Sequence, residues 1–109
     1  MEMLEKEDNA QLPLSRLFPT VNAKVLDFLL TNEGLSYTED EISELATVPS
    51  RTLQRSIQSL LSEKVIKREK KGRTYHYTAN LSAPRVSVLL SYINATMMDN
   101  LNEALLQKR

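Results

Sequence analysis

The chain has 109 residues, 41% of them hydrophobic and 26% charged, which predicts a single soluble globular domain and excludes a wholly disordered chain. The absence of cysteine excludes disulfides, thiolate metal sites and thiol redox chemistry. The formal net charge is zero, but residues 51–76 hold eight Lys or Arg against two Glu, so a neutral protein is predicted to carry a local basic surface.

Residues 1–11, at the N-terminus, are polar and acidic and show no sustained periodicity. We expect them to form a flexible acidic arm. They lack the basic-then-apolar order of a secretory signal, and nowhere does the chain have the ~20 apolar residues in a row that cross a bilayer. The expected location is therefore the cytoplasm, with no membrane partner.

Apolar periodicity, capping residues and prolines divide the rest of the chain into seven elements. In chain order these are a short helical turn within 12–18, a helix over 21–31, a brief strand at 35–38, helices over 39–46 and 50–64, a hairpin over 65–78, and a long helix from Ser82 to the C-terminus. This order predicts an α+β fold that is mostly helical.

Local signals mark several helix boundaries. Thr20 is placed to cap the helix that follows it, and Thr38 with Glu41 three positions later has the pattern of a capping box. Pro49 lacks a backbone N–H and biases Val48 away from the helical conformation. The helices before and after Pro49 are therefore predicted to be joined by a tight turn.

The two helices around Pro49 are predicted to be amphipathic, because their apolar residues recur three and four positions apart. The residues expected to face the core are Ile42, Leu45 and Ala46 in the first helix and Leu53, Ile57, Leu60 and Leu61 in the second. The opposite face of the second helix is polar and positive, which is the face a partner would meet.

The predicted hairpin has two arms rich in β-branched and aromatic residues around a glycine. We expect its turn at Lys71 and Gly72. Because side chains alternate along a strand, Tyr75 and Tyr77 are expected to pack on the core from the inner face, with His76 on the outer face. A single histidine indicates neither a metal site nor a pH switch.

The segment from Glu41 to Glu69, EISELATVPSRTLQRSIQSLLSEKVIKRE, resembles the helix-turn-helix and the start of the wing in winged-helix transcription regulators of the MarR and ArsR type. Thr52 and Arg55 stand where the recognition helix of that family commonly has Thr and Arg. The letters VIKRE resemble the strand that leads into the wing. With the flanking helices, the resemblance covers about residues 19–78.

The sequence departs from the family pattern at four positions. Thr47 and Lys64 each stand where the family often has Gly, Ser43 stands where Ala is typical, and Pro49 stands where a capping Ser is frequent. The next helix is therefore expected either to begin through Pro49 or to be capped by Ser50. The order of elements carries the resemblance more than any one of these residues.

The resemblance implies a winged helix-turn-helix DNA-binding domain over residues 12–80 and a C-terminal dimerisation helix over 81–109. A helix fits the major groove of B-DNA, where Arg and Gln pair with guanine and adenine edges. The recognition-helix residues expected to contact DNA are Ser50, Arg51, Thr52, Gln54, Arg55 and Gln58. The wing residues Lys70, Lys71 and Arg73 are expected to lie along phosphates or enter the minor groove.

These basic residues also have a purely structural interpretation. Arg51 and Arg55 would solubilise an ordinary surface helix, and Lys70, Lys71 and Arg73 would protect an edge strand from aggregation. Their place directly after a helix-turn-helix favours contact with DNA.

The last helix carries an apolar stripe longer than a small winged domain would cover by itself. The expected dimer-interface residues are Val86, Leu89, Leu90, Ile93, Met97, Leu101 and Leu105. Pairing with a second copy would bury the stripe and place two recognition helices about 34 Å apart, which predicts an inverted-repeat binding site. The alternative is a monomer in which this helix folds back on the helix over 21–31.

The sequence therefore predicts a homodimer that binds specific sequences of double-stranded DNA and regulates transcription as a repressor. One alternative is a nucleoid-associated or DNA-partition protein with little sequence preference, and another is a winged helix used for protein assembly. With one His, no Gly-rich phosphate loop and no nucleophile paired with a base, we expect no enzyme, no catalytic or metal-binding residue and no cofactor. The pattern indicates neither the operator nor a small-molecule effector.

Overall fold

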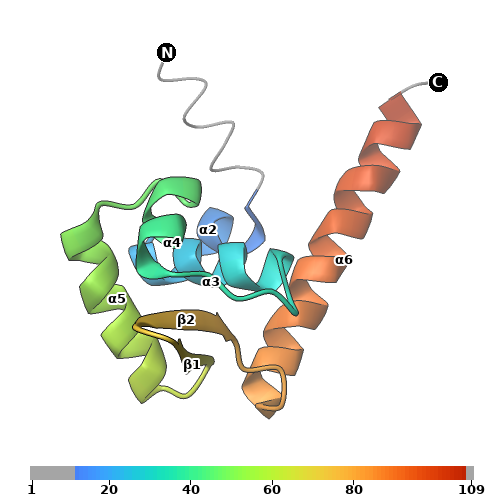
Figure 1. The fold of residues 1–109 in the computed structure, drawn as a ribbon. Coiled ribbons are helices and arrows are strands. Elements are labelled where there is room, and N and C mark those ends of the chain that lie inside the picture. Colours follow the sequence, from blue (N-terminus) through green and yellow to red (C-terminus); the bar gives the residue numbers. More distant parts are fainter. Residues whose placement is uncertain (1–11, 108–109) are drawn as a thin grey trace.

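The computed structural model describes residues 12–107, so the arm expected at 1–11 and the last two residues of the chain lie outside the described residues. The elements are α2 (Pro13–Leu17), α3 (Val21–Thr31), α4 (Glu39–Leu45), α5 (Ser50–Ser62), β1 (Ile66–Lys71), β2 (Thr74–Ala79) and α6 (Pro84–Gln107). Figure 1 shows α2 to α5 and the hairpin gathered into one body, with α6 running along its edge and extending beyond it. No helix within the described range is both long and apolar enough to span a bilayer.

The segment expected to form a strand at 35–38 makes only one pair with the hairpin. Tyr37 and Tyr77 form an isolated antiparallel bridge, with N–H to C=O distances of 2.9 and 2.7 Å in the two directions. The segment leaves the sheet immediately, because Thr38 already caps α4. The brief strand expected at 35–38 is therefore reduced to a single bridge beside β2.

The last helix begins at Pro84, two residues later than expected. Residues 80–83 form a turn instead, in which the Ala83 N–H donates to the Asn80 carbonyl oxygen at 3.1 Å. Ser82 hydrogen-bonds the Asn80 side chain at 3.2 Å and so belongs to this turn. Pro84 occupies the first position of the helix, where its missing N–H costs nothing.

The two helix caps expected from the sequence are confirmed. The Thr20 hydroxyl accepts from the Ala23 N–H at 3.2 Å. Thr38 and Glu41 form the complete capping box, in which Glu41 N–H donates to the Thr38 hydroxyl at 3.2 Å and Thr38 N–H donates to the Glu41 carboxylate at 2.9 Å. Each cap satisfies backbone donors that the first turn of a helix leaves free.

A buried carboxylate from α3 holds the short helix α2. The Asp27 side chain is fully buried and accepts from the backbone N–H groups of Leu14 and Ser15, each at 2.9 Å, and from the Ser15 hydroxyl at 2.8 Å. Three donors replace the water that the charged group loses on burial. Asp27 therefore caps α2 from a different helix, and no local sequence pattern pointed to it.

The core lies between α3, α4, α5, the base of the hairpin and the first half of α6. Its most deeply buried side chains include Val25, Leu29, Leu30, Ile42, Leu53, Ile57, Val86 and Ile93. Ile42, Ala46, Leu53, Ile57 and Leu60 are buried as expected and Leu61 is partly buried. Leu45, also expected in the core, is 59% exposed, because α4 is short and turns only Ile42 and Ala46 inward.

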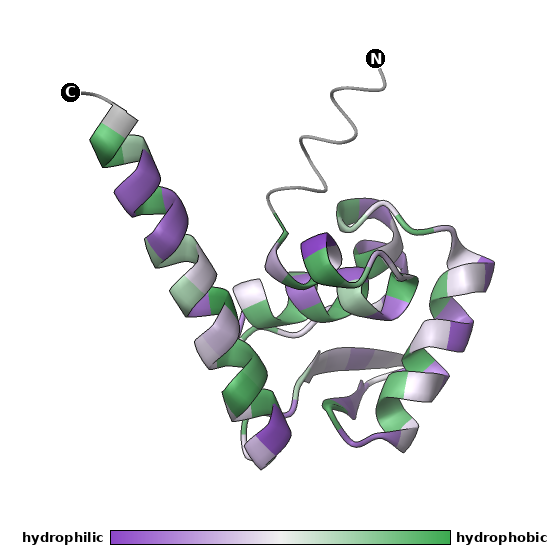
Figure 2. Ribbon diagram, turned by 180° about the vertical axis from the view of Figure 1, so that it is seen from behind, coloured by the Kyte–Doolittle hydropathy of each residue, from purple (hydrophilic) through white to green (hydrophobic). Residues whose placement is uncertain are grey.

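The stripe along α6 serves two different surfaces. Val86 and Ile93, expected at the interface between copies, are covered within the protomer itself, and we therefore no longer assign them to that interface. Leu89 and Leu90 pack partly against the same core. Toward its C-terminal end the helix extends beyond the body, yet hydrophobic residues recur along it there as well (Figure 2).

Candidate nucleic-acid interface

The outer face of α5 is polar, basic and open. Leu53, Ser56, Ile57 and Leu60 turn inward, and the six candidate contact residues all lie exposed on the opposite side: Ser50, Arg51, Thr52, Gln54, Arg55 and Gln58. The helix starts at Ser50 with Pro49 as its cap residue and without a capping side chain. Its N-terminal turn therefore presents free N–H groups next to Arg51, a combination that suits anions.

The turn between α4 and α5 is fixed by backbone hydrogen bonds and one lysine. Thr47 has a positive φ of 56°, and the Val48 N–H donates back to the Ser43 carbonyl at 2.9 Å, which is the bonding of a Schellman end. Val48 is buried as a plug. The Lys24 ammonium group donates to the Thr47 carbonyl at 3.1 Å, so α3 helps to hold the turn that orients α5.

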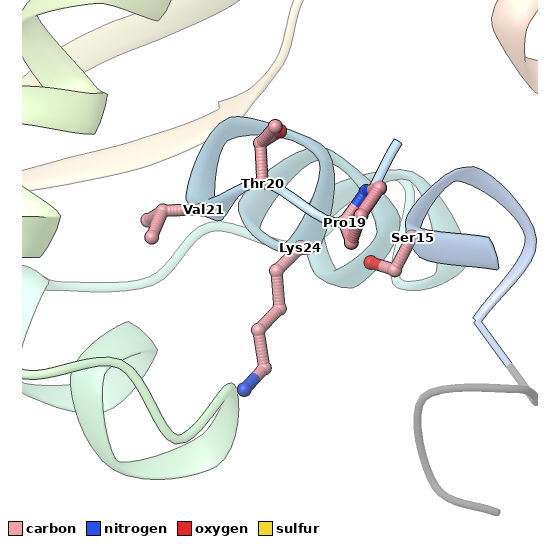
Figure 3. A pocket seen from close by; sticks show the side chains of 5 residues that line it. All are labelled: Ser15, Pro19, Thr20, Val21 and Lys24. Carbon is pink, nitrogen blue, oxygen red and sulfur yellow. The ribbon is translucent and has the colours of Figure 1, made fainter. Parts of the chain in front are cut away.

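Lys24 also borders a hollow of about 240 Å³ between α2 and α3. Its other lining residues are Ser15, Pro19, Thr20 and Val21. Figure 3 shows the Lys24 side chain extending from this hollow toward the loop after α4. The lysine is thus committed to the turn and is not part of the open basic surface.

The hairpin pairs β1 with β2 in antiparallel register from Ile66 with Ala79 to Lys71 with Thr74. Its turn consists of Gly72 and Arg73, one residue later than expected, and Gly72 has a φ of 64°, which favours glycine. The three candidate wing residues, Lys70, Lys71 and Arg73, are all exposed. The hairpin packs on α5 through β1. Toward its tip, Arg73 and Tyr75 line a hollow together with Thr38, Glu39 and Asp40 at the start of α4.

The two faces of the hairpin differ from the expectation at Tyr75. Tyr77 is buried as expected, but Tyr75 is 41% exposed, because it lies toward the tip, where the core no longer reaches. The Arg68 guanidinium lies 4.4 Å from the centre of the Tyr75 ring and the Lys70 ammonium lies 5.8 Å from it. Arg68 and Tyr75 therefore belong to the candidate interface. The sequence could have indicated this, because Tyr75 pairs with Lys70 across the hairpin and Arg68 is two residues from Lys70, so all three side chains lie on one face.

Near the base of the hairpin, the Tyr77 hydroxyl donates to the Glu39 carboxylate at 3.3 Å. Burial and then the negative charge of Glu39 raise the pKa of Tyr77 above its usual value of 10.0. His76, expected on the outer face, is half-buried, and its Nε2 makes no hydrogen bond with any described residue. Tyr77 therefore contributes no charge to the surface at neutral pH.

The charges of α5 and the hairpin remain available to a partner. Among residues 12–106, the ion pair that forms is Arg85 with Glu63, at 3.0 Å. The basic side chains on the outer face of α5 and on the wing form no ion pair with a described carboxylate. Lys71 is the most restrained of them, since its ammonium group lies 3.5 Å from the Ser36 hydroxyl.

Several solved structures have the same arrangement of helices and strands as this chain. A MarR family transcription regulator is 18% identical, with a TM-score of 0.65 over 99% of this chain and 71% of that chain. MepR of Staphylococcus aureus, a transcription regulator of the multidrug efflux pump MepA, is 15% identical, with a TM-score of 0.64 over 99% of this chain and 80% of its own. The chain has the winged helix-turn-helix fold.

A third winged helix is a homodimeric DNA-binding domain from Mycobacterium bovis, Mb0332, described as a possible ArsR-family regulator. It is 15% identical, with a TM-score of 0.58 over 93% of this chain and 89% of that fragment. No protein-family model and no curated protein matches the chain. The resemblance of residues 41–69 is thereby confirmed at the level of the fold, in which α4 and α5 form the helix-turn-helix and the hairpin forms the wing.

Proposed function

We propose that the protein is a homodimeric transcription regulator that binds specific sequences in double-stranded DNA and represses by occupying its operator. The observation that carries this proposal is that a winged helix-turn-helix exposes basic residues both on the outer face of α5 and on the wing. A MepR mutant of the same fold has been solved bound to an oligodeoxyribonucleotide, which supports DNA as the partner.

In this proposal α5 reads bases in the major groove. Arg51 and Arg55 are one turn apart and exposed on one side of the helix, and Gln54 and Gln58 extend the same surface. Arg pairs with guanine and Gln with adenine through two hydrogen bonds each. The buried side chains on the other face hold the helix rigidly, so these groups are positioned before DNA arrives.

The wing is proposed to hold the DNA backbone. Lys70, Lys71 and Arg73 surround the turn and carry charge but little shape specificity, which suits phosphates. Tyr75 stacks with Arg68 on the same hairpin and adds a flat apolar surface against a sugar or a groove wall. Each phosphate contact should contribute about 0.9 to the slope of log affinity against log salt concentration.

The dimer is proposed to form through the second half of α6. This part of the helix exposes five large apolar side chains, namely Met97, Met98, Leu101, Leu105 and Leu106. Burying a leucine or methionine contributes roughly 1.5–3 kcal/mol each, and a two-fold partner would bury the set on both copies. Mb0332, which has the same fold, is homodimeric, which supports a homodimer here. Residues 12–80 then act as the DNA-binding domain and 81–109 as the dimerisation helix.

The first test is selection of bound sequences from random DNA by the full chain. We expect an inverted repeat whose half-sites are about one helical turn apart. In competition, the selected site should be preferred over bulk DNA by roughly a thousandfold or more. Binding without a common sequence would instead establish the architectural alternative, in which the protein coats DNA with little preference.

The second test reverses charge on the proposed reading face. The double variant Arg51→Glu with Arg55→Glu should lose about 100-fold or more in affinity for the selected site, since each bidentate pair contributes about 1–3 kcal/mol. Arg16→Glu is the matched control, because Arg16 is exposed on α2 and its hydrogen bond, 3.4 Å long, goes to Asn100 of α6 and not to α5 or the wing. Sedimentation should show that this control is still a dimer. Unchanged binding by the double variant would contradict the proposal and favour a winged helix used for protein assembly.

Repression itself is tested with a promoter that overlaps the selected site. Adding the protein to purified polymerase should lower the yield of transcript, because both occupy the same DNA. An increase in transcript would replace repression by activation and leave the DNA-binding proposal intact.

A further inference from the structure

The segment directly after α5 is joined by hydrogen bonds to the segment that leads into α6. Three successive backbone carbonyls, those of Glu63, Lys64 and Val65, each accept a donor from residues 80–85. Arg85 donates to the Glu63 carbonyl, the Asn80 side chain donates to the Lys64 carbonyl at 2.9 Å, and the Asn80 backbone N–H donates to the Val65 carbonyl at 2.9 Å. We call this set the carbonyl clasp.

The chain is already shaped to present these carbonyls. Lys64 has a φ of 61°, and the N–H groups of Lys64 and Val65 donate back to Leu61 and Leu60 at 3.0 and 3.3 Å. This is the Schellman end of a helix, with the apolar contact between Val65 and Leu60 that accompanies it. The helix α5 therefore ends at one defined residue, and the chain leaves it in one defined direction.

Arg85 contributes to the clasp through its shape more than through its charge. Its guanidinium also donates to the Glu63 carboxylate at 3.0 Å, but both side chains are more than half exposed, and exposed ion pairs contribute little to stability. A guanidinium is a planar fork that meets two oxygens in a fixed orientation, which a lysine ammonium group does not do. The contact therefore fixes an angle between two helices.

The first half of α6 packs on α2 and α3, with Val86 and Ile93 buried, but this packing leaves space next to Arg85. A hollow of about 500 Å³ lies between α3, α5 and α6, lined mainly by apolar side chains such as Leu26, Leu60 and Val88, with Glu63 and Arg85 among the lining residues. The helix α5 packs on α3, α4 and β1. Within the described part of the chain, the hydrogen bonds that join α6 to the end of α5 come from Arg85.

We infer that Arg85 is a positioning residue that sets the angle between α5 and α6, and through it the spacing of half-sites that the dimer accepts. This inference rests on the proposed function, in which α6 joins the copies and α5 reads DNA. If the partner is reached through α6, the clasp is the direct connection between the dimer axis and the reading helix. Asn80 supports the same geometry from the base of the wing.

The first experiment varies the DNA. Two half-sites chosen by the wild-type protein are separated by spacers that change one base pair at a time, and affinity is measured for Arg85→Ala, Arg85→Lys and the wild type. Arg85→Ala should lose about tenfold in discrimination between the best and neighbouring spacings, a coupling of ordinary size, with single half-site affinity unchanged. Arg85→Lys should behave like Arg85→Ala if shape matters, whereas restored discrimination would show that charge suffices and would overturn the inference.

The second experiment needs neither DNA nor dimerisation. Because the chain has no cysteine, cysteines introduced by Gln54→Cys on α5 and Asn102→Cys on α6, both at exposed positions, are the only residues that the spin label modifies. With labelled chains diluted in unlabelled ones, the distance between the labels should be narrowly distributed, and Arg85→Ala should broaden or shift it. An unchanged distribution overturns the inference, whereas failure of the wild type to select any DNA overturns the proposed function alone.

Discussion

The two halves of α6 share one apolar periodicity but differ in what covers them. In the first half, Val86 and Ile93 are buried in the protomer's own core, whereas in the second half Leu101 and Leu105 are 53% and 56% exposed. A helical period therefore reports that a face is apolar along its length. It does not report which surface, within the same chain or from another copy, lies against each part of that face.

The largest expected effect comes from the exposed half. Leu101→Glu combined with Leu105→Glu should convert a dimer into a monomer, because each charge would have to be buried at the proposed interface. Sedimentation at micromolar concentration should show one protomer mass, while circular dichroism should show unchanged helix content. The matched control is Asp99→Lys with Glu103→Lys, two charge reversals at exposed positions that lie roughly opposite Leu101 on the same helix. If the Leu101→Glu and Leu105→Glu variant stayed dimeric, the assignment of α6 to the dimer interface would be wrong.

The second-largest effect is expected in the first half of α6, where the apolar side chains are buried. Ile93→Ala should lower the free energy of unfolding by about 2–5 kcal/mol, because it leaves a cavity in the core. Urea denaturation in the Leu101→Glu and Leu105→Glu background measures this without a contribution from dissociation. Met97→Ala, at a 43% exposed position, is the control and should cost much less in that background. If Ile93→Ala and Met97→Ala lowered the free energy of unfolding equally, the proposed difference in burial between the two halves of α6 would be contradicted.

A smaller effect is expected at Asp27, which holds α2 in place beside α6. Asp27→Ala leaves the N–H groups of Leu14 and Ser15 without their acceptor, at a cost of about 1–3 kcal/mol. Amide hydrogen exchange at those two residues should become faster than elsewhere in the core. Exchange that accelerates equally throughout the chain would mean that the carboxylate supports the whole fold and not α2 in particular. Asp99→Ala, at an exposed position, serves as the control.

The smallest effect is a gain. Lys64→Gly should raise the free energy of unfolding by up to about 1 kcal/mol, because glycine adopts a positive φ without the steric cost that a side chain brings. The gain stays small, because glycine also increases the conformational entropy of the unfolded chain. The increase should be the same in dimeric and monomeric backgrounds, since Lys64 lies on neither half of α6. Lys64→Ala removes the charge while keeping the β-carbon, and an equal gain from it would assign the effect to charge.

Local signals in the sequence were sufficient for the order of the elements and for most helix boundaries. Thr20, Thr38 and Glu41 cap their helices within three residues, and such contacts depend on neighbours along the chain. The departures at Thr47 and Lys64 from the family's glycines also had a physical meaning, because these are the described non-glycine residues with positive φ. Short-range geometry can therefore be predicted from residues that are close together in the chain.

Features that depend on distant contacts could not be predicted in the same way. Asp27 reaches back 12 and 13 residues to α2, and Arg85 reaches 22 residues back to Glu63. No periodicity indicates such pairs. For the same reason Leu45 and Tyr75 were assigned to the core although the elements that would cover them end too early. The nine candidate DNA-contacting residues are all exposed, which agrees with their proposed role without testing it.

The hydrogen bond that joins Asn80 to Val65 at the base of the wing has a consequence for how the protein tolerates insertions. It closes residues 66–79 into a loop whose two ends are pinned beside each other. The entropy of closing a loop grows only with the logarithm of its length, by roughly 0.6 kcal/mol for each doubling of a flexible loop. Residues added at Gly72 would therefore lengthen the reach of the wing along DNA while α5 and α6 keep their places.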